Sequence, residues 1–213
     1  MKIKLLGIIN HDLRKPVAHL ISYLELKKNI PESISESYEK EIEQRGLQLS
    51  ENLLHNMEDL LSWSKSQMDN FHPHFENINV SRLFSEIHSF FNNTDNIQFI
   101  AEEDIELFTD INYLKVIMRN LTLNSIQAIE KSNKIPDIKW TAREIDSKII
   151  LTIKDNGSGM PEEKIKILKE GVDDLSISQG LGLYIIHDLA KSISCEIDVI
   201  SCDGIGTTIT LLI

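Results

Sequence analysis

The sequence predicts an α+β fold, in which an antiparallel hairpin of two long helices precedes an α/β sandwich. Apolar residues recur at helical spacing over residues 3–69. Beyond residue 76, short segments rich in β-branched residues alternate with helical segments. A polar stretch broken by Pro73 separates the two regions. We therefore place one domain at residues 1–70 and a second domain at residues 71–213.

The first domain is expected to contain two helices joined by a short turn. Residues 3–29 carry a broad apolar stripe, with a kink expected at Pro16. Over residues 35–69 the apolar residues recur at roughly heptad spacing. One hairpin does not bury two such wide stripes, so a symmetric homodimer that forms a four-helix bundle is the simplest solution. Docking of the hairpin onto the rest of the chain is the alternative.

The second domain is expected to place helices on one face of a mixed sheet. The expected strands are residues 78–80, 97–101, 138–144, 148–154, 196–201 and 207–213. The expected helices are one that is capped by Ser81 and ends near Asn92, one opened by Asp110, a short one from Pro161, and one that begins at Gly180.

Composition narrows the range of partners. A net charge of −11 over 213 residues argues against a nucleic-acid partner, which requires a basic face. Two cysteines, Cys195 and Cys202, suggest a reducing compartment and are interpreted as small core residues. No run approaches the roughly 18 apolar residues of a membrane helix, so no membrane contact is expected of this segment. The sequence begins inside a helical pattern, which suggests a cytoplasmic piece of a longer protein, possibly one anchored in a membrane.

The stretch Asp155-Asn156-Gly157-Ser158-Gly159-Met160 follows a predicted strand. Asp155 ends the strand, and Gly157 and Gly159 are able to take positive φ and to let a flat ligand approach the backbone. A carboxylate only accepts hydrogen bonds, so Asp155 suits a ligand edge that donates, such as the amino group of adenine. Taken alone, the same letters are typical of a hairpin turn.

Two further segments accompany this turn. Asn120 and Asn124 lie four residues apart and share one helical face, where amide oxygens are suitable ligands for Mg²⁺. Gly180 and Gly182 open a later helix, whose free N–H groups form a natural phosphate cradle. Each segment is a weak signal alone, and the three in this order are a strong one.

These motifs, N-L-T-L-N, D-N-G-S-G-M, G-L-G-L and the later G-I-G-T, resemble the N box and glycine boxes of the GHKL ATPases. That superfamily, with its Bergerat-type sandwich, includes sensor histidine kinases, DNA gyrase, Hsp90 and MutL, and the resemblance covers roughly residues 76–213. It implies that the domain binds ATP with Mg²⁺, the metal held by Asn124. The nucleotide-binding residues that it implies are Asn120, Asn124, Asp155, Gly157, Gly159, Gly180, Leu181, Gly182, Leu183 and Thr207.

A second resemblance lies near the start of the chain. His11-Asp12-Leu13-Arg14-Lys15-Pro16 is similar to the phosphoacceptor motif of sensor histidine kinases, in the first of two hairpin helices. The resemblance implies phosphoryl transfer from ATP to a ring nitrogen of His11, with Asp12 as orienting group and proton acceptor. It further implies transfer to an aspartate in the receiver domain of a response regulator.

Three departures from the family pattern leave an alternative open. Gln127 stands where the N box often carries a basic residue, and the lid segment 171–179 holds two aspartates and no basic residue. Lys15 stands where kinases with phosphatase activity usually carry Thr or Asn. The alternative is a catalytically idle, dimeric GHKL-type docking module that binds nucleotide weakly. A gyrase- or MutL-type ATPase is disfavoured, because those chains carry no histidine hairpin.

Overall fold

The structure, a computed structural model, describes residues 72–91, 96–102, 105–132, 134–171 and 181–213, with scattered residues between 17 and 64. The chain divides into two compact units. The first unit is Met1–Ser64 with Asp174–Leu181, and the second is Lys65–Asp173 with Gly182–Ile213. The predicted domain boundary after residue 70, together with His11, Asp12 and Lys15, lies outside the described residues.

In the first unit, every described residue between 17 and 64 is helical. The side-chain ammonium of Lys27 forms an ion pair with Glu43 Oε1 at 2.7 Å. A Cβ atom built on Gly46 would overlap the ring of Tyr23. These two contacts join residues 23–27 to residues 43–46.

The second unit contains a mixed five-stranded sheet in the order β2-β4-β5-β7-β6. Its strands are β2 (Ile97–Ala101), β4 (Ile138–Ile145), β5 (Lys148–Asp155), β6 (Glu196–Cys202) and β7 (Gly206–Leu212). The β2–β4 pair is parallel, and the other pairs are antiparallel. A separate antiparallel pair is formed by β1 (Glu76–Asn79) and β3 (Glu106–Thr109).

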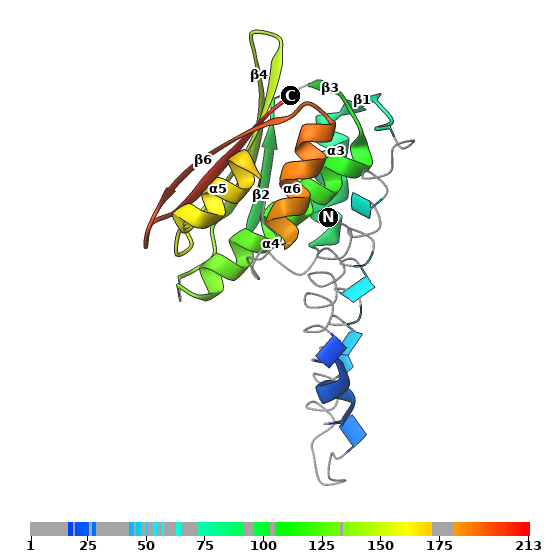
Figure 1. The fold of residues 1–213 in the computed structure, drawn as a ribbon, viewed down its shortest axis with the longest axis vertical. Coiled ribbons are helices and arrows are strands. Elements are labelled where there is room, and N and C mark those ends of the chain that lie inside the picture. The colour runs from blue at the N-terminus through cyan, green and yellow to red at the C-terminus, as the bar shows by residue number, and fades with distance from the viewer. Residues whose placement is uncertain are drawn as a thin grey trace. The chain divides into compact units, whose positions relative to one another are not determined.

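The helices of the second unit cover one face of the five-stranded sheet (Figure 1). They are α3 (Val80–Phe90), α4 (Ile111–Glu130), α5 (Glu162–Glu170) and α6 (Leu181–Ser192). Asp110 caps α4 as predicted, because its carboxylate accepts from the backbone N–H groups of Asn112 and Tyr113. The predicted α/β sandwich is therefore confirmed.

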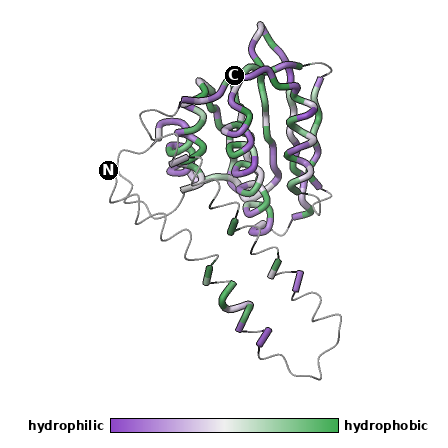
Figure 2. The backbone as a smooth tube through the Cα atoms, turned by 90° about the vertical axis from the view of Figure 1, so that its right-hand side faces the viewer, coloured by the Kyte–Doolittle hydropathy of each residue, from purple (hydrophilic) through white to green (hydrophobic). Residues whose placement is uncertain are grey.

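The core lies between the helices and the covered face of the sheet. Buried and partly exposed residues alternate along much of β4, β5 and β7, the pattern of a sheet with one buried face. Hydrophobic and hydrophilic residues both occur along the strands (Figure 2). Trp140 of β4 is fully buried, and its indole N–H donates to the hydroxyl of Thr122 at 2.9 Å. This buried bond joins α4 to the sheet and thereby positions the segment that carries Asn124.

Three local predictions are wrong. The cap of α3 is Asn79, whose side chain accepts from the N–H of Arg82, and not Ser81. Strand β3 was not expected, because its four residues directly precede the capping Asp110 and give little periodic signal. Cys195 is buried as expected, whereas Cys202 is exposed, since it ends the edge strand β6.

Candidate functional site

Asp155 lies at the end of β5 with only 6% of its surface exposed. Its Oδ1 accepts hydrogen bonds from the backbone N–H groups of Gly157 at 2.8 Å and Thr207 at 3.2 Å. Its Oδ2 accepts from the hydroxyl of Ser125 at 3.1 Å. A carboxylate offers about four acceptor positions, and three donors leave one for a ligand. The carboxylate is thus held in one orientation and still able to accept from a ligand.

The protonation of Asp155 reflects its burial. Burial raises the pKa of its carboxyl above the usual range, and the three hydrogen bonds and the charge of Lys134 offset only part of this effect. A ligand N–H group that donated to the remaining acceptor position would stabilise the ionised form. The site is therefore better suited to a hydrogen-bond donor than to an anion.

Two glycines shape the backbone beside this carboxylate. Gly159 has a φ of +85°, and a Cβ there would lie 2.6 Å from the carbonyl oxygen of Cys202. Gly157 does not have positive φ. It is required instead because a Cβ would lie 2.8 Å from the Cβ of Ala128 on α4. The turn therefore packs directly on the helix that carries Asn124, and the N–H of Ser158 donates to the carbonyl of Ala128 at 3.1 Å.

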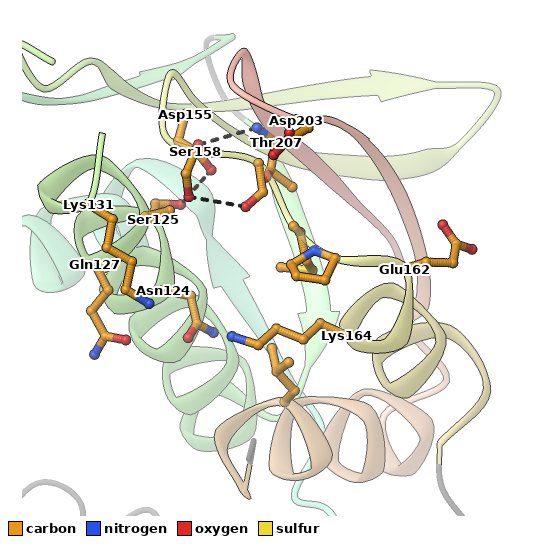
Figure 3. Close-up of a pocket in the computed structure, with 15 residues that line it drawn as sticks. Asn124, Ser125, Gln127, Lys131, Asp155, Ser158, Glu162, Lys164, Asp203 and Thr207 are labelled. Carbon is orange, nitrogen blue, oxygen red and sulfur yellow. Dashed lines mark hydrogen bonds between the residues drawn. The ribbon is translucent and has the colours of Figure 1, made fainter. Parts of the chain in front are cut away.

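A cavity of about 510 Å³ opens over Asp155 (Figure 3). Among the residues implied from sequence, the structure brings Asn124, Asp155, Gly159, Leu183 and Thr207 into its wall. The wall also contains Ser125, Gln127, Ala128, Lys131, Ser158, Met160, Pro161, Glu162, Lys164 and Asp203.

Other predicted site residues do not line the cavity or lie outside the described part of the chain. Asn120 does not line the cavity, and its amide donates to the carbonyl of Val116 at 2.9 Å. A Cβ on Gly182 would lie 3.1 Å from Asn120 Oδ1, so this glycine permits a close approach of α6 to α4. Gly157 lies beneath the wall rather than in it. Gly180 lies outside the described residues, as does the side chain of Leu181.

Several residues of the site were not foreseen from the sequence. Ser125 directly follows Asn124, and its bond to Asp155 joins two of the predicted motifs. Lys134 donates to the carbonyl oxygens of Asn156 at 2.9 Å and Gly204 at 2.7 Å. Ser125 lies within the predicted helix, but no local signal predicts its bond to Asp155, and Lys134 belongs to no periodic or glycine-rich pattern.

The cavity presents two kinds of polar group. Asp155, Ser125, Ser158 and Thr207 gather in one part of it, whereas Asn124, Lys131 and Lys164 lie in another part (Figure 3). The first part accepts a hydrogen bond from a neutral, flat group against glycine backbone. The second part offers an amide and two cations. Such a wall suits a ligand with a donor edge at one end and negative charge at the other, as a nucleotide has.

Comparison with known proteins identifies the class of this domain. Residues 109–213 match the family described as "Histidine kinase-, DNA gyrase B-, and HSP90-like ATPase". The match covers the part of the chain that carries the predicted motifs, and it supports an ATP-binding domain of this kind there.

Over nearly its whole length, the chain is similar to sensor histidine kinases. It is 28% identical to the sensor histidine kinase YvrG of Bacillus subtilis, over 96% of this chain and 37% of that protein. It is 24% identical to the histidine-protein kinase AtoS of Escherichia coli, over 99% of this chain and 34% of that protein. It is 29% identical to the histidine protein kinase SaeS of Staphylococcus epidermidis, over 99% of this chain and 62% of that protein. The predicted resemblance to sensor histidine kinases is thus confirmed, and the chain spans about a third of the length of YvrG and AtoS.

Solved structures share the fold. The histidine kinase AdeS of Acinetobacter baumannii superposes with a TM-score of 0.65 at 20% identity, over 95% of this chain and 96% of that one. The kinase ThkA, solved in complex with the response regulator protein TrrA, superposes with a TM-score of 0.60 at 22% identity, over 98% of this chain and 60% of that one. In the part of the chain that the structure describes, no helix has the length and apolar character that a membrane crossing requires.

Proposed function

We propose that this chain is the cytoplasmic core of a sensor histidine kinase, which phosphorylates His11 from Mg²⁺-ATP and passes the phosphoryl group to a response regulator. The observation that carries the proposal is the wall of the cavity, which places the buried acceptor Asp155 and the amide of Asn124 around one hollow. Adenine would donate its amino hydrogen to Asp155. Its triphosphate would extend toward Asn124, which would hold the metal through its amide oxygen.

The transfer itself is a displacement at phosphorus. A neutral ring nitrogen of His11 attacks the γ-phosphorus, the bond to the β-phosphate oxygen breaks, and ADP leaves with the bonding electrons. Asp12 holds the imidazole in the reactive tautomer and accepts its other ring proton. A carboxylate of the receiver domain of the regulator then attacks the phosphohistidine, and Asp12 returns its proton to the ring, so that neutral imidazole is the leaving group.

The first unit supports a dimeric hairpin that presents His11. Lys27 pairs with Glu43, and Tyr23 contacts Gly46. The residue number therefore increases along one segment where it decreases along the other, as in an antiparallel pair of helices. Apolar side chains on both segments are more than half exposed in the single chain, namely those of Ile21, Leu24, Leu47, Leu54 and Met57. A second copy would bury these side chains in a four-helix bundle.

The alternative is an idle dimeric docking module that binds nucleotide weakly. It is favoured by the composition of residues 171–179, which the family resemblance implies to be the lid over the nucleotide. Asp173 and Asp174 would add negative charge to such a lid, and no basic residue there offsets it.

Labelling distinguishes the two functions. The protein is incubated with γ-labelled ATP and Mg²⁺, and the kinase proposal expects label that is labile in acid and stable in base. His11→Gln is expected to abolish the label while ATP affinity stays unchanged, and His72→Gln serves as the matched control that keeps it. Nucleotide binding without any label would support the docking module, and label that persists in His11→Gln would show that another residue accepts the phosphate.

A further inference from the structure

Two lysines from separate segments line the cavity. Lys131 directly follows α4, and Lys164 lies in the first turns of α5, 33 positions further along the chain. Their side chains extend toward Asn124 from opposite sides (Figure 3). Neither residue belongs to the motifs that resemble the GHKL boxes. We refer to Lys131 and Lys164 as the lysine pair.

The charges of the lysine pair are not neutralised within the cavity. The carboxylates in the wall are Asp155, Glu162 and Asp203. Asp155 is buried and satisfied by three donors. Among the described residues, neither ammonium group of the pair lies within ion-pairing distance of a carboxylate. Two cations that face the same hollow repel each other, and an anion placed between them removes that repulsion.

The position of the lysine pair defines which part of a ligand it would meet. If adenine donates to Asp155, then the polyphosphate would extend toward the part of the cavity wall that holds Asn124, Lys131 and Lys164. Each ammonium offers three hydrogen-bond donors and no acceptor, which suits phosphate oxygens. Positive charge is also scarce in the two stretches that the family resemblance would place near the phosphates, because Gln127 is neutral and residues 171–179 include no basic residue.

We propose that the lysine pair binds the polyphosphate of ATP and supplies the positive charge that Gln127 and the segment 171–179 do not. This inference rests on the proposed function, since it takes ATP as the ligand. It makes Lys131 and Lys164 binding residues that select for the number of phosphates, with no part in recognising the base. The positive charge lies on two residues of the cavity wall, Lys131 after α4 and Lys164 on α5.

The test is a calorimetric series with adenosine, ADP and ATP, at low salt and with EDTA in place of Mg²⁺, so that metal does not mask the phosphate charge. The variants are Lys131→Gln, Lys164→Gln and the double substitution. The matched control is Lys166→Gln, because Lys166 lies on the same helix as Lys164, is exposed, and is 3.9 Å from the carboxylate of Glu170.

Each single substitution is expected to weaken ATP binding about fivefold, the scale of one partly exposed charge contact. The double substitution is expected to weaken it about twentyfold, with adenosine affinity unchanged and Lys166→Gln silent. Added salt screens the charges and should therefore reduce the loss of ATP affinity caused by each substitution.

An ATP affinity that is the same in the double variant and the wild type would overturn the inference and leave the proposed function standing. An equal loss for adenosine and ATP would also overturn it, because it would mark a structural role. Wild-type protein that binds no ATP, either in EDTA or with Mg²⁺, would overturn the proposed function and the inference together.

Discussion

The ammonium group of Lys134 donates to the carbonyl oxygen of Gly204 at 2.7 Å, across 70 residues of chain. It also donates to the carbonyl oxygen of Asn156 at 2.9 Å. One side chain thus joins the turn after Asp155 to the turn between β6 and β7, and both turns border the cavity. Its positive charge also lowers the pKa of Asp155 and so opposes part of the effect of burial. Lys134 therefore holds together the two turns that border the cavity near Asp155, without lining the cavity.

Replacing Lys134 with Met is expected to lower the free energy of unfolding by about 1 kcal/mol, because an exposed charged group loses its hydrogen bonds. Adenosine affinity should fall about threefold as the two turns loosen. Lys134→Arg should restore part of both values, and Lys148→Met, at the far end of β5, should change neither. Thermal unfolding and calorimetry measure the two quantities, and an unchanged adenosine affinity in Lys134→Met would contradict a positioning role.

Asp155→Asn is expected to weaken ATP and adenosine binding at least about tenfold. The substitution places an amide donor where the ligand also donates, and a hydrogen bond to a charged group contributes about 1.5–3 kcal/mol. Asp203→Asn is the matched control, because Asp203 lines the same cavity but is exposed. Wild-type affinity in Asp155→Asn, measured by calorimetry, would refute the placement of adenine.

The same carboxyl predicts a pH dependence. Burial raises the pKa of Asp155 in the folded protein, so adenosine affinity should begin to fall on acidification at a higher pH than an ordinary aspartate would cause. Protonation removes acceptor capacity, and affinity therefore falls as pH decreases through the raised pKa. The stability of the protein without ligand depends on pH in the opposite direction. The folded state binds the proton of Asp155 more tightly than the unfolded state does, so this carboxyl stabilises the fold at low pH. That stabilisation is lost as pH rises through the raised pKa. Adenosine titrations between pH 4 and pH 8 should show the fall in wild type and not in Asp155→Asn.

Asn124→Ala is expected to remove most of the Mg²⁺ dependence of ATP binding, because it deletes the amide oxygen proposed to hold the metal. Binding of adenosine should remain as in wild type. The measurement is ATP affinity with Mg²⁺ and with EDTA, and Asn112→Ala, at the other end of α4, is the control. An Asn124→Ala protein whose ATP binding still strengthens with Mg²⁺ as in wild type would place the metal elsewhere.

Little phosphatase activity toward the partner regulator is expected, and Lys15 is the reason. Alignment of the water that attacks a phospho-aspartate calls for a hydroxyl or amide that accepts a hydrogen bond, and lysine has donors only. Lys15→Thr should therefore raise the rate at which the phosphorylated regulator loses phosphate, with Lys28→Thr as control. Rapid dephosphorylation of the regulator by the wild-type protein would contradict this prediction. A Lys15→Thr variant with an unchanged dephosphorylation rate would mean that Lys15 is an ordinary surface residue.

Much of the second unit was predictable because its signals are local. Alternation marked β4 and β5, Asp110 marked the start of α4, and the glycine pairs marked the turns that border the cavity. The errors were local as well. Asn79 and Ser81 are both good capping residues two positions apart, and four-residue β3 is too short to show a period. The exposure of Cys202 depends on β6 being an edge strand, which no alternation reveals.

The sequence by itself determined the class of the domain, because the order and spacing of Asn124, Asp155 and the glycines can be recognised along the chain without knowledge of the fold. Tertiary structure decided which of these residues share the cavity, because its wall is drawn from segments up to 83 positions apart, from Asn124 to Thr207. It made Gly157 a packing contact with Ala128 rather than a residue with positive φ, and it brought Ser125 and Lys134 to the turns around Asp155. It also brought Lys131 and Lys164 into the same cavity wall as Asn124. Hydrogen bonds and charge act through space over a few ångströms, and only folding sets those distances.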